Sequence, residues 1–218
     1  MHYLCIMEFN QADIVNLSDT SKVKLSENII LADADYVDYV AFQLSVQFER
    51  MLDRRIPKAD MSQWAVDVVL DGGLRDDGKK HETQLVLVHE KANAQMENFQ
   101  PSVYDTELNA RAFADERLGE FLVNAVPVGD VVGKDDYILD AIRLVLAHNE
   151  VRRLMIVPNA EQGTLYDEVQ SVLRNSDTDQ RITVFAMQPL PGGNFRQEIL
   201  GYSVMNALGI RAEELNNK

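Results

Sequence analysis

Apolar residues follow two patterns along the chain, short continuous runs and longer stretches in which they recur every three to four positions. The runs are typical of parallel strands buried on both faces, and the longer period is typical of helices with one apolar face. The runs occupy residues 28–33, 84–89, 120–128, 153–157 and 182–187. The stretches that we expect to be helical are residues 36–53, 61–71, 103–118, 135–146, 164–174 and 195–208.

The first ten residues have a different pattern, in which apolar Tyr3, Cys5, Met7 and Phe9 alternate with polar neighbours. Such alternation predicts an edge strand. Because an unpaired strand edge can join a second sheet, this strand could form a homodimer contact or could be covered within its own chain.

Strands and helices alternate over most of the chain, which favours right-handed crossovers between parallel strands. We therefore predict an α/β fold, a doubly wound, mainly parallel sheet with helices on both faces and an added amino-terminal edge strand. A length of 218 residues fits a single domain, residues 1–218.

Particular residues predict where two of the helices begin. Asp60 can cap the helix that starts at residue 61, and the pair Gly72–Gly73 can end it in a left-handed turn. Asp135 or Asp136 can cap the helix that follows the third apolar run.

Charge narrows the choice of partners. The chain has 35 acidic and 21 basic residues, a net charge of -14, and this repels phosphate backbones. On net charge we therefore expect no nucleic-acid partner, unless a small basic patch or a carboxylate cluster that holds a divalent cation meets the phosphates. No apolar run reaches the roughly 18 residues of a membrane span, so we expect no membrane partner and a cytoplasmic location, and the physiological partner stays open.

Known nucleotide motifs do not fit the chain. No GxGxxG follows the first apolar run, as a dinucleotide site would require. Gly129, Gly133 and Lys134 are similar to a phosphate-binding loop, but the spacing is one residue short and Asp135 stands where a metal-binding hydroxyl belongs.

The histidines offer one candidate. His81 falls in an expected exposed loop, residues 75–82, and His148 closes a helix. His89 ends a strand beside Glu90, so it is either a structural residue or part of a small-molecule site together with the loop 188–194.

Carboxylates form the most suggestive constellation. Asp33 and Asp35 end the first buried strand, and Asp136 and Asp140 lie one helical turn apart after a later strand. If these strands are neighbours, the four acids could bind Mg²⁺ or Mn²⁺ and activate a water. The alternative is that they are helix caps and solvated surface groups.

The acid-tipped run ILADAD, the long helix after it and the run VVGKDDYILDAIRLV together resemble PIN/NYN-type metal-dependent ribonuclease domains. The resemblance implies that Asp33 or Asp35, Asp135 or Asp136, and Asp140 bind metal. The chain departs from the family at residues 158–161, where Glu161 is the one possible ligand. In general character it also resembles bacterial families of unassigned function.

Two functions follow. The first is a non-catalytic or partner-binding α/β domain of an uncharacterised family. The alternative is an Mg²⁺- or Mn²⁺-dependent phosphodiesterase or ribonuclease.

Overall fold

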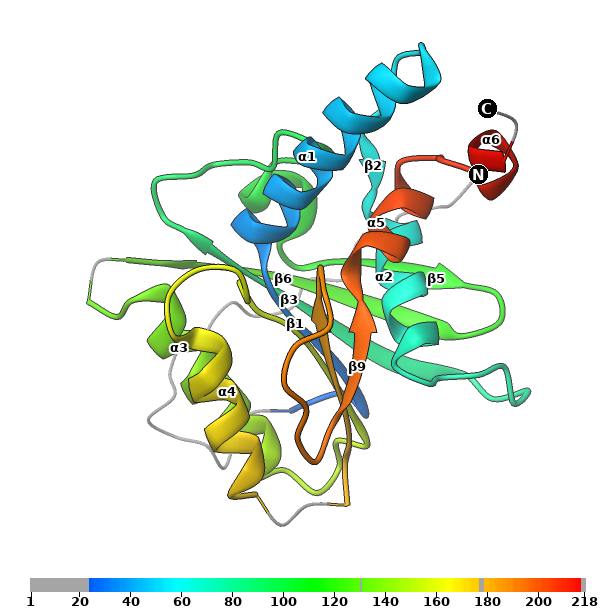
Figure 1. Cartoon of the computed structure of the whole chain (residues 1–218). Coiled ribbons are helices and arrows are strands. Elements are labelled where there is room, and N and C mark those ends of the chain that lie inside the picture. Colours follow the sequence, from blue (N-terminus) through cyan, green and yellow to red (C-terminus); the bar gives the residue numbers. More distant parts are fainter. Residues whose placement is uncertain (1–23, 130, 177–178, 217–218) are drawn as a thin grey trace.

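The computed structural model describes residues 24–129, 131–176 and 179–216 (Figure 1). The edge strand and the dimer contact that we expect from the first ten residues lie outside this range. Within it, the chain is a mixed α/β structure built on one large, mainly parallel sheet.

Seven strands form the large sheet, in the order β5-β6-β3-β1-β7-β8-β9. Every neighbouring pair is parallel except β5 and β6. The short strands β2 (Ala59–Asp60) and β4 (Phe99–Gln100) pair separately. The strands of the large sheet are β1 (Asn28–Asp33), β3 (His81–Glu90), β5 (Arg111–Asp115), β6 (Gly119–Val128), β7 (Arg153–Val157), β8 (Arg181–Ala186) and β9 (Arg196–Ile199).

The five predicted strands and four of the six predicted helices are confirmed, with small shifts at their ends. The helices are α1 (Ala34–Leu52), α2 (Met61–Asp71), α3 (Lys134–Leu146), α4 (Leu165–Arg174), α5 (Leu200–Ala207) and α6 (Ala212–Asn216).

The predicted helix over residues 103–118 is wrong. A π-helical turn, η2 (Tyr104–Leu108), is followed by strand β5, which is antiparallel to β6. Phe113 of β5 stacks on Phe121 of β6 with ring centroids 4.6 Å apart. Cross-strand aromatic packing of this kind stabilises a hairpin. The spacing of apolar residues along the sequence does not reveal such a contact.

The predicted helix over residues 195–208 is right only in its second half. Residues 196–199 form β9, which pairs with β8 and so satisfies backbone groups that would otherwise be left at the sheet edge. The helix α5 begins at Leu200.

The helix starts were predicted with mixed success. Asp60 caps α2, accepting hydrogen bonds from the backbone N–H of Ser62 and Gln63, and Gly73 follows α2 with a φ of +92°. The prediction for α3 is wrong, because this helix begins after Gly133 and no side chain caps it. Asp135 and Asp136 lie inside its first turn instead.

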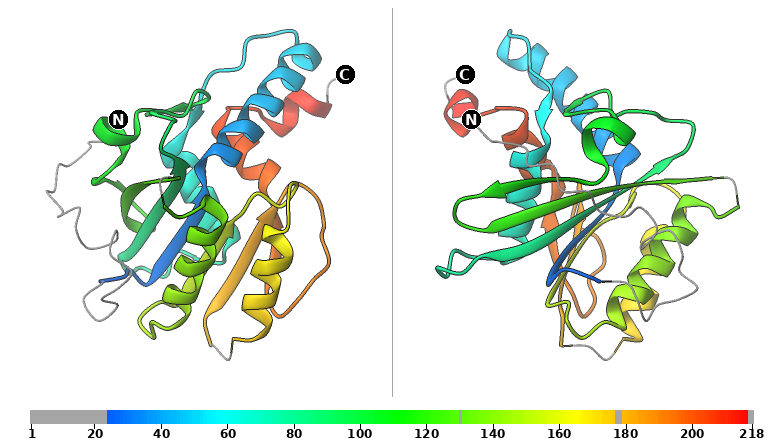
Figure 2. Two further views of the ribbon diagram at one scale, coloured as in Figure 1. Left: turned by 90° about the vertical axis from the view of Figure 1, so that its left-hand side faces the viewer. Right: turned by 180° about the vertical axis from the view of Figure 1, so that it is seen from behind.

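Two hydrophobic clusters surround the sheet strands. Ile30 and Ala32 of β1 belong to the first cluster, together with apolar residues of α1, α2 and α5. Ile29 and Leu31 belong to the second, together with apolar residues of α3 and α4. Figure 2 shows these two groups of helices apart from each other. Alternate residues of one strand therefore pack against different helices.

None of the helices in the described part of the chain is long and apolar enough to cross a membrane.

Candidate binding site at the carboxyl edge of the sheet

The central strand β1 marks the place where the strand order reverses. The chain passes from β1 to β3 and β6 on one side, and then continues with β7 and β8 on the other side. In open parallel sheets, ligands bind outside the carboxyl ends of strands at such a reversal. The residues that follow β1, β3 and β7 are therefore the first place to look for a site.

Asp33, Asp35 and Lys134 form a cluster at this edge. The Lys134 ammonium lies 2.9 Å from Asp33 Oδ1 and 2.8 Å from Asp35 Oδ2. The side chains of Asp33, Lys134 and Asp35 are 1%, 15% and 21% exposed. Asp33 also caps α1, since its Oδ1 accepts from the backbone N–H of Tyr36 at 3.0 Å.

The three groups differ in how the site shifts their pKa values. Burial raises the pKa of Asp33, and the nearby Lys134 only partly offsets this. Burial also opposes ionisation of Asp35, but hydrogen bonds from Lys134, the Glu90 backbone and Asn93 outweigh it and lower its pKa. Burial alone would lower the pKa of Lys134, and the two carboxylates raise it. Lys134 is therefore held as a cation.

The other two predicted metal ligands lie elsewhere. Asp136 and Asp140 are exposed on α3, and Asp140 pairs with Arg143 at 2.6 Å. In the ranges described by the structure, no three His, Cys, Asp or Glu side chains form a group that could hold a metal ion. The structure thus brings together two of the four predicted acids, with a lysine between them.

A groove opens beside this cluster, between α1 and the segment that connects β3 to η2. Its volume is about 590 Å³. Tyr39 and Phe42 project from α1 into its wall and are about half exposed, although both are large and apolar. The groove is lined by Asp35, Asp38, Tyr39, Phe42, Ala92, Asn93, Ala94, Gln95, Glu97, Asn98 and Tyr104.

Asp38 holds the connecting segment against α1. Its carboxylate accepts hydrogen bonds from the backbone N–H groups of Glu97 and Asn98, at 3.1 and 2.8 Å, and from the Asn98 side chain at 3.0 Å. These donors are uncharged, so none of them forms an ion pair with Asp38, which orders the rim of the groove.

His89 lies behind the groove, where its ring stacks on Tyr104 with centroids 3.7 Å apart and planes 9° apart. Its Nδ1 donates to the Glu90 carbonyl at 3.0 Å, and burial lowers its pKa. The small-molecule hypothesis named His89 with the loop 188–194, but the lining of this groove includes no residue of that loop. The expectation that His81 is exposed is wrong, since His81 is buried.

Sequence reasoning considered Lys134 only as part of a phosphate loop and missed its role as the cation between two acids. A usable signal was present. A lysine in the first turn of a helix opposes the helix dipole, so its position there calls for a carboxylate partner. Tyr104 and Asp38 had no such signal, because their roles depend on how the segment after β3 folds back.

The fold and the site define an α/β domain with a mainly parallel sheet and a groove at its carboxyl edge. The chain belongs to a family of unknown function, DUF6621, whose model matches residues 22–215. This confirms the prediction of a domain from an uncharacterised family. No curated protein and no solved structure matches the chain.

Proposed function

We propose that this domain is a non-catalytic binding domain and that its groove receives a basic segment of a partner protein. The observation that carries the proposal is the groove itself, a concave surface where two exposed aromatic rings of α1 stand beside carboxylates. Large apolar side chains exposed around a concavity are typical of interaction sites.

The chemistry of the groove selects a cation. Asp38 and Glu97 accept hydrogen bonds from uncharged amides, which leaves their charges uncompensated by those partners. The faces of Tyr39 and Phe42 attract an ammonium or guanidinium group by cation–π interaction. Lysine or arginine side chains can use both features at once.

The ionisable groups beside the groove favour binding over catalysis. Lys134 is held as a cation by two carboxylates, and a protonated amine cannot act as a base or nucleophile. Burial lowers the pKa of His89, and this residue donates to a backbone carbonyl of its own strand. Both Lys134 and His89 are therefore engaged by contacts within the protein itself, which favours a structural role for them.

We further propose that the sheet is doubly wound, with α1, α2 and α5 on one face and α3 and α4 on the other. The two hydrophobic clusters support this arrangement. It matters for function because the reversal of a doubly wound sheet positions ligands at the edge where the groove lies.

Fluorescence anisotropy with short labelled peptides tests the proposal. A lysine- and arginine-containing peptide should bind, while an acidic peptide of the same length should not. Phe42→Ala and Asp38→Asn should each weaken binding about fivefold or more, a loss of roughly 1 kcal/mol as expected for one cation–π or charge contact. Phe42 is exposed enough for the alanine variant to fold.

Glu116→Gln is the matched control, because Glu116 is an exposed acid outside the lining of the groove. It should leave the affinity unchanged. If no basic peptide binds at low salt, the proposal is wrong. It also fails if Glu116→Gln weakens binding as much as Asp38→Asn, since the attraction would then come from the net charge alone.

A further inference from the structure

Two buried polar atoms where β1 ends and α1 begins, Asp33 Oδ2 and Tyr36 Oη, have no hydrogen-bond partner in the described ranges. Asp33 is 1% and Tyr36 4% exposed. A buried polar atom without a partner costs stability, and such atoms therefore call for an explanation. Both residues also have a structural role, because Asp33 caps α1 and Tyr36 packs in the first hydrophobic cluster.

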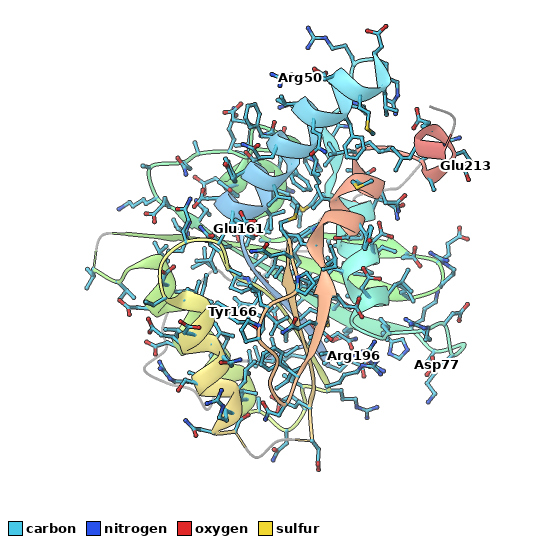
Figure 3. All side chains as sticks on the ribbon, viewed as in Figure 1. Arg50, Asp77, Glu161, Tyr166, Arg196 and Glu213 are labelled. Atoms are coloured by element: carbon cyan, nitrogen blue, oxygen red, sulfur yellow. The ribbon has the colours of Figure 1, made fainter. Side chains whose placement is uncertain are left out.

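Both residues lie where β1 ends and α1 begins, next to the strand reversal between β1 and β7. Burial, together with the charges of Glu161 and Asp33, raises the pKa of Tyr36. Glu161 belongs to the loop that follows β7, and Figure 3 labels it beside the beginning of α1. The Tyr36 hydroxyl therefore keeps its proton and can donate, while Asp33 Oδ2 can accept.

We propose that the carboxyl edge of the sheet, where β1 ends and α1 begins, binds a small neutral molecule with two adjacent hydroxyl groups, through Asp33 Oδ2 and Tyr36 Oη. One ligand hydroxyl donates to the Asp33 carboxylate, and the other accepts from the Tyr36 hydroxyl. A vicinal diol of this kind occurs in free sugars and in the ribose of nucleosides. Because both protein atoms are buried, the ligand can reach them only if neighbouring residues move.

Charge argues against the other ligand classes. Three acidic side chains, Asp33, Asp35 and Glu161, lie around this position, and the Lys134 ammonium contacts the first two. The acids therefore outnumber this cation, and a phosphate or carboxylate ligand would be repelled. An ammonium group could pair with Asp33 but would leave the Tyr36 donor unmatched. A diol satisfies the acceptor and the donor together.

This site is separate from the groove, since Asp33 and Tyr36 are absent from the groove lining. The two proposals can therefore fail independently. Phe42→Ala should not affect diol binding, and Tyr36→Phe should not affect peptide binding.

Ligand-observed NMR and thermal melting with three probes, methyl riboside, adenosine and dideoxyadenosine, test the inference. Binding of adenosine and methyl riboside but not of dideoxyadenosine supports a diol site and indicates that the sugar suffices. Binding of adenosine alone supports the diol site and indicates a nucleoside. Binding of dideoxyadenosine as tightly as adenosine overturns the inference, as does the absence of binding by all three at millimolar concentration.

Tyr36→Phe removes one oxygen and keeps the packing, and Tyr202→Phe, at an exposed tyrosine of α5, is the matched control. Tyr36→Phe should lower the affinity for the bound probe about tenfold. The melting temperature of this variant without ligand should stay the same or rise. If Tyr36→Phe binds the probe as tightly as Tyr202→Phe does, the inference is overturned. So does a melting temperature that falls by several degrees with binding unchanged, because the hydroxyl then has a structural partner.

Discussion

Each end of the parallel sheet places a nitrogen group between two carboxylates. At the carboxyl end this group is Lys134, between Asp33 and Asp35. At the amino end it is His81, whose Nδ1 lies 2.6 Å from Glu27 and whose Nε2 lies 3.0 Å from Asp77. Figure 3 labels Asp77 at the end of the molecule away from Glu161.

The two clusters differ in burial and in what surrounds them. The carboxylates at the amino end are 25% and 45% exposed, so water shares in stabilising their charges. At the carboxyl end, Asp33 is buried and has one oxygen without a partner in the described structure. A nitrogen group between two carboxylates thus lies in a partly exposed cluster at the amino end and beside a candidate ligand site at the carboxyl end.

The largest expected effect is that of Lys134→Met. Removing the ammonium leaves Asp33 and Asp35 as two adjacent carboxylates, one of them buried, and breaking a buried pair on one side costs about 3–5 kcal/mol. Urea denaturation measures the free energy of unfolding. Lys79→Met is the control, because Lys79 is largely exposed and 3.9 Å from Asp77, and it should cost less than about 0.5 kcal/mol.

A triple variant separates charge from packing. Asp33→Asn and Asp35→Asn, added to Lys134→Met, remove all three charges and should recover a large part of the lost stability. A loss below about 1 kcal/mol for Lys134→Met would show that the cluster stabilises the fold no more than an exposed salt bridge does.

A smaller effect is expected for His81→Phe at the amino end. The substitution removes two hydrogen bonds but leaves Glu27 and Asp77 in reach of water, so we expect a loss of about 1–2 kcal/mol. The same denaturation experiment measures it. A loss as large as that of Lys134→Met would mean that solvent exposure does not explain the difference between the ends.

These two clusters also show what the sequence could reveal. The strands, four of the helices and the Asp60 cap follow from local patterns, because apolar period and capping chemistry act over a few residues. Lys134 and Asp33 are 101 positions apart, and the His81–Glu27 pair spans 54. Such pairs depend on which strands become neighbours, and local periodicity does not contain that information.

The same reason explains the errors in the secondary structure. The hairpin of β5 and β6 and the pairing of β9 with β8 replace predicted helices, because tertiary strand pairing overrides local preference. At the candidate site, Asp33 and Asp35 were found from their place at the end of an apolar run. The groove was not, because Asp38, Glu97 and Tyr104 meet only through the fold of the segment after β3.

The pH dependence of stability tests the burial of His89 near the carboxyl end of the sheet. Burial lowers the pKa of His89 in the folded state, while the unfolded value is about 6.5. The unfolded chain then binds more protons, so the contribution of His89 is complete above about pH 6.5 and is lost as the pH falls towards the folded value. Denaturation of the wild type and of His89→Phe at several pH values measures it.

His89→Phe keeps the stacking on Tyr104 and removes the titration. The difference in unfolding free energy between the wild type and this variant should therefore shift in favour of the variant as the pH falls below about 6.5. A constant difference across this range would contradict the assigned burial of His89.

The smallest expected effect is that of divalent metal at the carboxyl end, and it tests the resemblance to metal-dependent ribonucleases. Because the Lys134 ammonium lies between Asp33 and Asp35, we expect no change in melting temperature when Mg²⁺ or Mn²⁺ is added to metal-free protein. Any native-state binding would raise that temperature by mass action. A rise that disappears in the Asp33→Asn, Asp35→Asn double variant would mean that a metal ion competes with Lys134, and RNA cleavage should then be assayed.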